Sequence, residues 1–248
     1  MTWPEFFKCL VSPDGSVLKG CCLNGARIES FQTYVLGHII SYALLKKGIE
    51  PLHATVFEHE GRAGALLGDS GYGKSSLAAA LVRSGARMLT DDLLVVKWVD
   101  GQWMAYPGPP RIKLFPDVAR QILGVSEGRT FMNSLTSKAI IPVPPDQQCA
   151  AAVPLVALYK LPRPTLRKKN SGVSIRTLSK RHACIELITN TFNTTIEAPW
   201  RLKQQFNLAH RLAAGVPVKA ISYRRTLEDL PTVAAALLED LPRVRCLV

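Results

Sequence analysis

The chain has 248 residues, which is enough for one large domain or for one domain with a small appendage. Its hydrophobic fraction of 47% is ordinary for a packed globular protein. The longest apolar stretch, Val35–Leu45, is interrupted by His38 and Ser41 and is too short to span a bilayer. The start of the chain lacks the pattern of a secretory signal, so we expect a cytoplasmic protein with no membrane segment.

The net charge of +12 is unevenly distributed along the chain. Residues 1–110 carry ten Lys/Arg and ten Asp/Glu, whereas residues 111–248 carry twenty-one Lys/Arg and nine Asp/Glu. This excess favours an anionic partner such as phosphate groups or an acidic peptide. Nucleic acid is unsupported, because zinc-finger spacing and regular basic-aromatic alternation are missing. Six cysteines without a C-x-x-C pair argue against a zinc or redox site.

The first fifty residues predict a small β cap followed by a helix. Turn residues at Pro13-Asp14-Gly15 and at Asn24-Gly25 divide residues 5–30 into short strands. Apolar residues near helical spacing predict a helix over Phe31–Lys47, and Gly48 is its expected stop. We therefore treat residues 1–50 as an N-terminal β cap and helix.

The next segment predicts two strands joined by a tight turn. The strands are His53–Phe57 and Arg62–Leu67, with the turn in Glu58–Gly61. If Glu60 and Gly61 are the central turn residues, His53 lies opposite Gly68, and a turn one residue shorter places it opposite Leu67. In both registers the His53 side chain is expected at the mouth of the loop that follows the second strand.

The remaining elements continue an α/β pattern through residues 51–248. A hairpin is predicted around Asp100-Gly101, and residues 107–150 are rich in proline and predict mostly loops. A basic surface loop is expected at Leu161–Asn170, and it is either simply solvated or a docking surface for an acidic substrate. The other predicted elements are a helix over Lys74–Ser84, strands over Arg87–Thr90, Leu93–Trp98 and Trp103–Tyr106, and helices over Asp117–Leu123, Pro199–Ala214 and Leu230–Leu238.

The loop Gly68–Ser75 matches the phosphate-binding pattern G-x-x-x-x-G-K-[ST] at every fixed position. Its glycines let consecutive backbone N–H groups turn toward phosphate oxygens, and the following helix directs its positive end to the same place. We predict that this loop binds ATP and that Lys74 reaches the phosphates, while the Ser75 hydroxyl ligates Mg²⁺. The predicted nucleotide-binding residues are Gly68, Asp69, Ser70, Gly71, Tyr72, Gly73, Lys74, Ser75 and Ser76.

Two adjacent acids, Asp91 and Asp92, follow the strand that comes after the loop and its helix. Alternation along a strand directs neighbouring side chains to opposite sides. One carboxylate can therefore help hold Mg²⁺ while the other receives the proton of an attacking hydroxyl. Farther along the chain, Arg111 and Lys113 are candidates for neutralising phosphate charge.

Together, His53, the strand hairpin, the Gly68–Ser75 loop and the Thr90-Asp91-Asp92 run resemble the catalytic domain of bacterial HPr kinase/phosphorylase. The resemblance covers roughly His53–Leu94. It implies a P-loop kinase domain over residues 51–248, of the α/β mixed-sheet type shared with phosphoenolpyruvate carboxykinase. By the same resemblance His53 is an active-site histidine, Lys74 the catalytic lysine, Ser75 a magnesium ligand and Asp92 the proton acceptor, with Asp91 supporting Asp92 or the metal.

The chain also departs from that family's pattern. Ser76 stands where HPr kinases usually have glutamate, and residues 107–123 lack their glycine-rich signature segment. The expected acceptor is therefore a serine of a peptide or small protein other than HPr. Shorter members of this group include kinases that phosphorylate a serine of lasso-peptide precursors. A kinase of a small hydroxylated metabolite and a nucleotide-dependent switch without catalysis stay open, as does a homo-oligomeric assembly.

Overall fold

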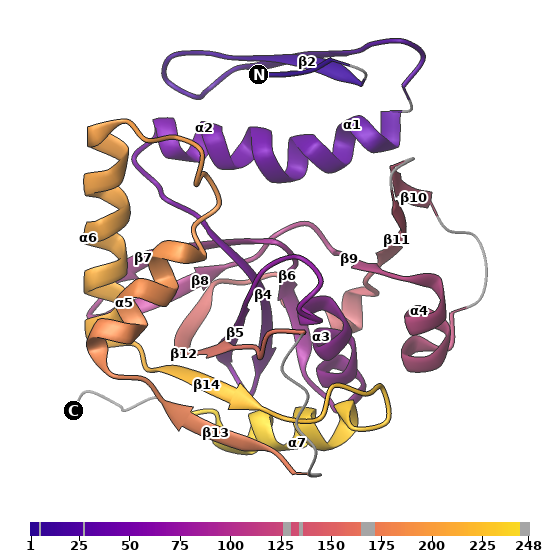
Figure 1. Cartoon of the computed structure of the whole chain (residues 1–248), viewed down its shortest axis with the longest axis vertical. Coiled ribbons are helices and arrows are strands. Elements are labelled where there is room, and N and C mark those ends of the chain that lie inside the picture. Colours follow the sequence, from indigo (N-terminus) through magenta and orange to yellow (C-terminus); the bar gives the residue numbers. More distant parts are fainter. Residues whose placement is uncertain (5, 27, 126–129, 134–135, 165–171, 244–248) are drawn as a thin grey trace.

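The computed structural model describes residues 1–4, 6–26, 28–125, 130–133, 136–164 and 172–243. Within these residues the body is an eight-stranded sheet of order β13-β14-β12-β5-β4-β7-β8, and β6 pairs with β4 beside this path (Figure 1). The predicted mixed sheet is confirmed, because β12 runs parallel to β5 and β14 while β4 runs antiparallel to β5, β6 and β7. The strands are β4 (Leu52–His59), β5 (Arg62–Leu67), β6 (Arg87–Thr90), β7 (Leu93–Val99), β8 (Gln102–Tyr106), β12 (Val153–Lys160), β13 (Ser174–Thr177) and β14 (Val218–Ser222).

Helices cover both faces of this sheet. Helices α3 (Lys74–Arg83), α4 (Pro116–Leu123) and α7 (Leu230–Asp240) contribute to one apolar core, and α5 (Lys180–Thr189) and α6 (Pro199–Gly215) contribute to another. The alternation of β5 connects the two cores, because Leu66 belongs to the first and Ala65 and Leu67 belong to the second. Among the described residues, no helix has both the length and the apolar character needed to cross a bilayer.

The β4–β5 hairpin determines where His53 lies. His59 pairs with Arg62, and the two residues between them, Glu60 and Gly61, have φ values of 49° and 76°. Two positive φ angles are the mark of a type I′ turn, whose twist matches that of the flanking strands. The ladder continues to Ala54 opposite Leu67, so His53 lies opposite Gly68. The first of the two predicted registers is therefore confirmed.

The N-terminal residues form a small antiparallel sheet on one continuous helix. The sheet contains β1 (Thr2–Trp3), β2 (Phe7–Val11) and β3 (Leu18–Cys22), and the helix contains α1 (Ile28–Tyr34), a π-helical segment η1 (Val35–Ile39) and α2 (Ile40–Lys46). The helix lies between this sheet and the body (Figure 1). Aromatic rings join the two layers, since the Phe7 ring centre is 4.8 Å from that of Trp3 and 4.7 Å from that of Tyr34.

Two features of this unit differ from the sequence prediction. The helix begins at Ile28 rather than at Phe31, because the turn at Asn24-Gly25 closes early through the bond from the Ala26 N–H to the Leu23 carbonyl. The helix also contains a π turn, where the Ile40 N–H donates to the Val35 carbonyl five residues back. A π turn holds one residue more than an α turn, and this leaves the apolar periodicity of the helix almost unchanged, so the sequence pattern does not indicate it.

The prediction of loops over residues 107–150 is wrong in part. This region holds a three-stranded antiparallel sheet of β9 (Arg111–Leu114), β11 (Thr136–Pro142) and β10 (Thr130–Asn133), and a short 3₁₀ turn, η2 (Pro145–Gln147). The strands are short and bordered by prolines such as Pro110, Pro116 and Pro142, which gave the sequence the appearance of loop. In the basic segment 161–170, residues 165–170 lie outside the described part, and a docking role there stays a prediction.

A buried polar network fixes the 189–194 segment, which follows α5. Arg201 and Glu50 are 1% and 3% exposed, and their side chains form an ion pair with N–O distances of 3.0 and 3.1 Å. Arg201 also donates to the Thr191 hydroxyl at 3.0 Å, as Gln205 does at 2.6 Å. Since every member has a partner, the ion pair and the hydrogen bonds offset the desolvation cost of burying these groups.

Loss of one partner from this network should be costly. We expect Arg201→Met to lower the free energy of unfolding by about 3–5 kcal/mol, because Glu50 is left as an unpaired buried carboxylate. Urea denaturation measures this change. Lys203→Met on the exposed face of α6 is the matched control and should change stability by less than about 1 kcal/mol. Equal stability of the two variants would contradict the role given to the network.

Candidate functional site

The Gly68–Ser75 loop joins β5 to α3 and has the backbone of an anion-binding loop. Gly68, Gly71 and Gly73 have φ values of 144°, 85° and 87°, which side chains rarely tolerate. Gly73 is the N-cap of α3 and supplies no side-chain acceptor to its first turn. The N–H groups of that turn, with the positive end of the helix behind them, are therefore available to an anion.

Lys74 is buried beneath this loop, with 6% of its surface exposed. Its ammonium contacts three acceptors, which are the Gly68 carbonyl, the Asp69 carbonyl at 3.2 Å and His53 Nε2 at 3.0 Å. Burial lowers the pKa of Lys74 to about 8, so the group still carries its charge at neutral pH. The site thus holds a partly desolvated cation, and such a cation interacts strongly with phosphate.

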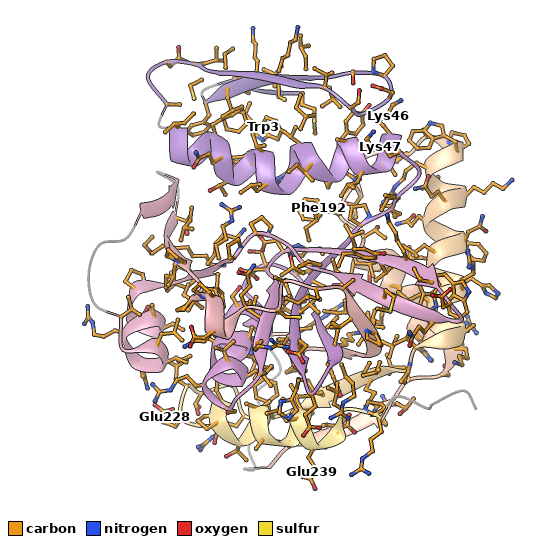
Figure 2. The ribbon with its side chains drawn as sticks, turned by 180° about the vertical axis from the view of Figure 1, so that it is seen from behind. Trp3, Lys46, Lys47, Phe192, Glu228 and Glu239 are labelled. Atoms are coloured by element: carbon orange, nitrogen blue, oxygen red, sulfur yellow. The ribbon has the colours of Figure 1, made fainter. Side chains whose placement is uncertain are left out.

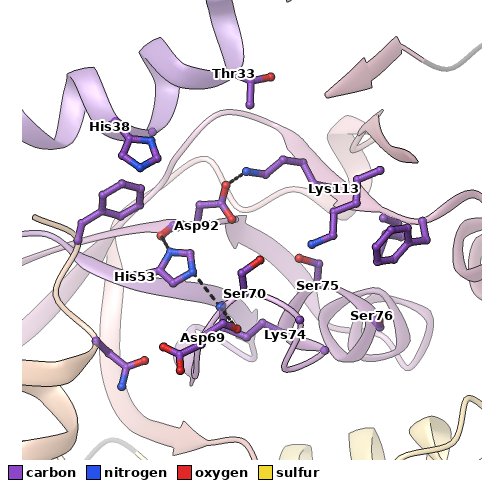
Figure 3. A pocket seen from close by; sticks show the side chains of 18 of the residues that line it. Thr33, His38, His53, Asp69, Ser70, Lys74, Ser75, Ser76, Asp92 and Lys113 are labelled. Carbon is purple, nitrogen blue, oxygen red and sulfur yellow. Dashed lines mark hydrogen bonds and ion pairs between the residues drawn. The ribbon is translucent and has the colours of Figure 1, made fainter. Parts of the chain in front are cut away.

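His53 joins Lys74 to the acidic pair. Its Nδ1 lies 3.2 Å from the Asp92 carbonyl and its Nε2 faces Lys74 (Figure 3). Burial, and then the Lys74 charge, lower the pKa of His53 to about 3, so the imidazole is neutral. The two partners assign the tautomer, because the carbonyl requires Nδ1–H and the ammonium requires the Nε2 lone pair. His53 therefore orients Lys74 and does not serve as a base near neutral pH.

Asp91 is held by hydroxyl and amide donors. Its carboxylate accepts from Thr55 Oγ1 at 2.7 Å, from the Lys113 N–H at 3.0 Å and from Ser75 Oγ at 3.2 Å. A carboxylate beside a hydroxyl at the end of a phosphate loop is a donor set of the kind Mg²⁺ takes, with phosphate and water completing the shell. No cluster of three or more His, Cys, Asp or Glu side chains fit for a metal occurs among the described residues. The residues present fit Mg²⁺ bound together with a nucleotide rather than a metal bound by protein alone.

Asp92 faces away from Asp91 and toward a cavity. β6 ends at Thr90, as predicted, but the alternation expected of the two acids does not apply, because they lie beyond the strand and Asp92 adopts a left-handed φ of 75°. This bend brings the Asp92 carboxylate to the Lys113 ammonium, with 21% of the Asp92 side chain exposed. Both acids contact Lys113, but Asp91 meets its backbone N–H and Asp92 meets its ammonium, and the cause of this difference is a bend rather than strand alternation.

The cavity has a volume of about 620 Å³ and lies between the loop and the N-terminal helix (Figure 3). Seven of the nine predicted nucleotide-binding residues line it, together with His53 and Asp92. Tyr72 does not, because its ring packs over Gly68 beside the apolar core, and Gly68 contributes its carbonyl to Lys74 instead. The seven are Asp69, Ser70, Gly71, Gly73, Lys74, Ser75 and Ser76.

Several cavity residues carry no signal in the sequence. Lys113 on β9 was a candidate, but Lys138 on β11 and Arg225 after β14 were not, and both line the cavity. Arg225 donates to the Gly71 carbonyl at 3.1 Å. Each is a single basic residue far from the loop in sequence, so only the pairing of β9 with β11 and of β12 with β14 brings them to it. Arg111 does not line the cavity.

Asn190 is a further residue that sequence reasoning missed. Its side-chain oxygen accepts from the Gly68 N–H at 2.8 Å, and its carbonyl accepts from the His53 N–H at 2.6 Å. Its amide nitrogen donates to the Glu186 carbonyl at 2.8 Å at the end of α5. Asn190 therefore positions both the start of the loop and His53. The next residue, Thr191, is held by the buried Arg201 network.

Comparison with known proteins finds a distant likeness among solved structures and none in sequence. No protein-family model matches the chain, and no curated protein matches it. Among solved structures, the Hpr(Ser) kinase/phosphatase from Coxiella burnetii is similar at 16% sequence identity and a TM-score of 0.43, over 77% of this chain and 95% of that one.

The pKa of Lys74 leads to a test by pH. If its charge binds phosphate, ATP affinity should be steady below about pH 7.5 and should fall above about pH 8, by at most about tenfold per pH unit. Titration with a fluorescent ATP analogue and Mg²⁺ across this range measures the fall. Lys74→Arg keeps its charge throughout and should remove the alkaline decline. A wild-type affinity that stays constant to about pH 9.5 would show that Lys74 does not bind the phosphates.

Proposed function

We propose that this chain is an ATP- and Mg²⁺-dependent phosphotransferase that acts on a hydroxyl, with a serine of a peptide or small protein as the leading acceptor. The observation that carries the proposal is the arrangement of Lys74, Ser75 and Asp91 beneath the loop while the Asp92 carboxylate faces the cavity. The first three residues have the character of a phosphate and metal site. The fourth is an accessible acid placed beside it.

The residues divide the chemistry among them. When bound, ATP supplies the phosphoryl group and Mg²⁺ neutralises its charge. The loop N–H groups and Lys74 bind the phosphates, and Ser75 and Asp91 hold the metal. Asp92 accepts the proton of the acceptor hydroxyl, and Lys113 orients this carboxylate. His53 stays neutral and holds Lys74 at the loop.

A partly exposed acid at this position favours catalysis over a nucleotide-dependent switch. Lys113 pairs with the Asp92 carboxylate, yet the carboxylate still lines the cavity, and a protein that merely binds nucleotide has no need of a base there. A kinase of a small hydroxylated metabolite uses the same residues. The choice between the two kinds of acceptor depends on the part of the cavity above Asp92.

Asp92→Asn separates catalysis from binding. Asparagine tolerates the left-handed φ of this position but cannot take the proton, so we expect phosphotransfer to fall about 10²–10⁴-fold with ATP affinity nearly unchanged. Radiolabelled ATP with a panel of serine peptides and small alcohols measures transfer, and calorimetry measures binding. Asp100→Asn is the matched control, because Asp100 is exposed and also has a positive φ, 48°. If Asp92→Asn transfers phosphate at the wild-type rate, Asp92 is not the base.

A second pair of variants tests the metal site. Asp91→Asn and Ser75→Ala should each raise the Mg²⁺ concentration needed for half-maximal ATP binding by about tenfold or more, since each loses a hard oxygen ligand. ATP titrations at several Mg²⁺ concentrations give this value. Ser84→Ala, at the other end of α3, should leave it unchanged. An unaltered Mg²⁺ requirement in both variants would remove Ser75 and Asp91 from the metal site.

A further inference from the structure

The cavity has two chemically different halves. The half at the loop is cationic on balance, because the cavity is lined by four basic residues, Lys74, Lys113, Lys138 and Arg225, and by two acids, Asp69 and Asp92. The half beneath the N-terminal helix is lined by uncharged groups, which are those of Thr33, Tyr34, Gly37, His38, Phe192 and Thr194. Phosphates belong in the cationic half. The uncharged half therefore calls for a different, uncharged occupant.

We propose that the uncharged half is the acceptor subsite and that His38 is the residue that binds the acceptor. Its occupant is an uncharged hydroxyl group on a slender carrier, either a small alcohol or a serine in an unfolded peptide, and not the surface of a folded protein. This inference rests on the proposed phosphotransferase function and specifies its substrate class.

His38 has the position and the hydrogen-bonding groups for this role. It is exposed, lines the cavity, and comes from the helix above Asp92 and Lys113 (Figure 3). Desolvation, and then the Lys113 charge, lower the pKa of His38, so its imidazole is neutral and offers one donor and one acceptor. A hydroxyl bound between His38 and Asp92 lies at the boundary of the two halves.

Helix geometry and an aromatic contact direct His38 to this place. Thr33, Tyr34, Gly37 and His38 line the cavity, because their spacing places them on one face of the helix, whose segment η1 contains Gly37 and His38. The Phe192 ring lies between the two histidines, 5.1 Å from the His38 ring centre and 5.4 Å from that of His53. Figure 2 shows Phe192 between the N-terminal helix and the body. The histidine is thereby oriented by packing.

The helix above the cavity is fixed to the body, which limits the size of the acceptor. Ser41 Oγ donates to Asn193 Oδ1 at 3.1 Å, and Asn193 Nδ2 donates to the Ser41 carbonyl at 3.2 Å, both in buried positions. Asn193 belongs to the 189–194 segment that the Arg201 network holds. The cavity of about 620 Å³ is within the range of small-molecule sites, and the phosphates must share it. An acceptor that shares this volume with the phosphates is, in our proposal, a single side chain or a small alcohol.

The test uses probes of increasing bulk with the full-length chain. Transfer from labelled ATP is measured to glycerol, to N-acetylserinamide, to an unstructured serine octapeptide and to folded HPr. We expect transfer to at least one slender probe and none to HPr. A comparison of the transfer to glycerol with the transfer to the two serine probes identifies the carrier. His38→Ala should raise KM for the active probe about three- to tenfold, with the effect on KM for ATP much smaller.

Two further variants make the result specific to His38. His38→Gln keeps a donor and an acceptor and should recover part of the lost affinity for the probe, whereas a merely structural role would give no such recovery. His210→Ala, an exposed histidine on α6 outside the cavity, should behave as wild type. Efficient transfer to HPr would overturn the subsite, and so would an unchanged KM for the probe in His38→Ala. The subsite would also be overturned if the wild-type protein binds ATP but transfers phosphate to no slender probe. Failure of the wild type to bind ATP would instead overturn the proposed function.

Discussion

The site depends on one buried cation, Lys74. An ammonium taken out of water is costly unless its protons have acceptors, and here two loop carbonyls and the neutral His53 supply them. His53 can do so because the type I′ turn sets the β4–β5 register that places it opposite Gly68. Its other nitrogen meets the Asp92 carbonyl. The hairpin, the loop and the acidic bend are thus joined through one side chain.

The 189–194 segment extends this arrangement to the rest of the molecule. Asn190 holds the first N–H of the loop, Phe192 packs between His53 and His38, and Asn193 binds the N-terminal helix at Ser41. The Arg201–Glu50 pair holds the segment through the hydrogen bond from Arg201 to the Thr191 hydroxyl. One short stretch therefore sets the distance between the Gly68–Ser75 loop and the helix above it, and this distance limits the size of the acceptor that we propose.

Local sequence patterns predict the part of the site that lies between His53 and Asp92 in the chain. The loop, the two candidate registers of the hairpin and the pair Asp91-Asp92 follow from turn chemistry and glycine placement in adjacent residues, and the structure has the first of the two registers. Residues such as Lys138, Arg225 and Asn190 reach the site through strand pairing and helix packing far along the chain, and no local pattern marks them. The π turn at His38 was missed for a related reason, because one additional residue per turn leaves the apolar periodicity almost unchanged. Strands β9 and β11 are bordered by prolines, and for this reason the sequence predicts a loop where they lie.

The most direct test of the account is a crystal structure with a non-hydrolysable ATP analogue and Mg²⁺. We predict the β and γ phosphates at the N–H groups of the Gly68–Ser75 loop, Lys74 moved from the Gly68 carbonyl to these phosphates, and the metal at Ser75 and Asp91. The Asp92 carboxylate should stay beside the terminal phosphate, below His38. An analogue bound away from the loop, or a metal held by residues other than Ser75 and Asp91, would contradict the central claim.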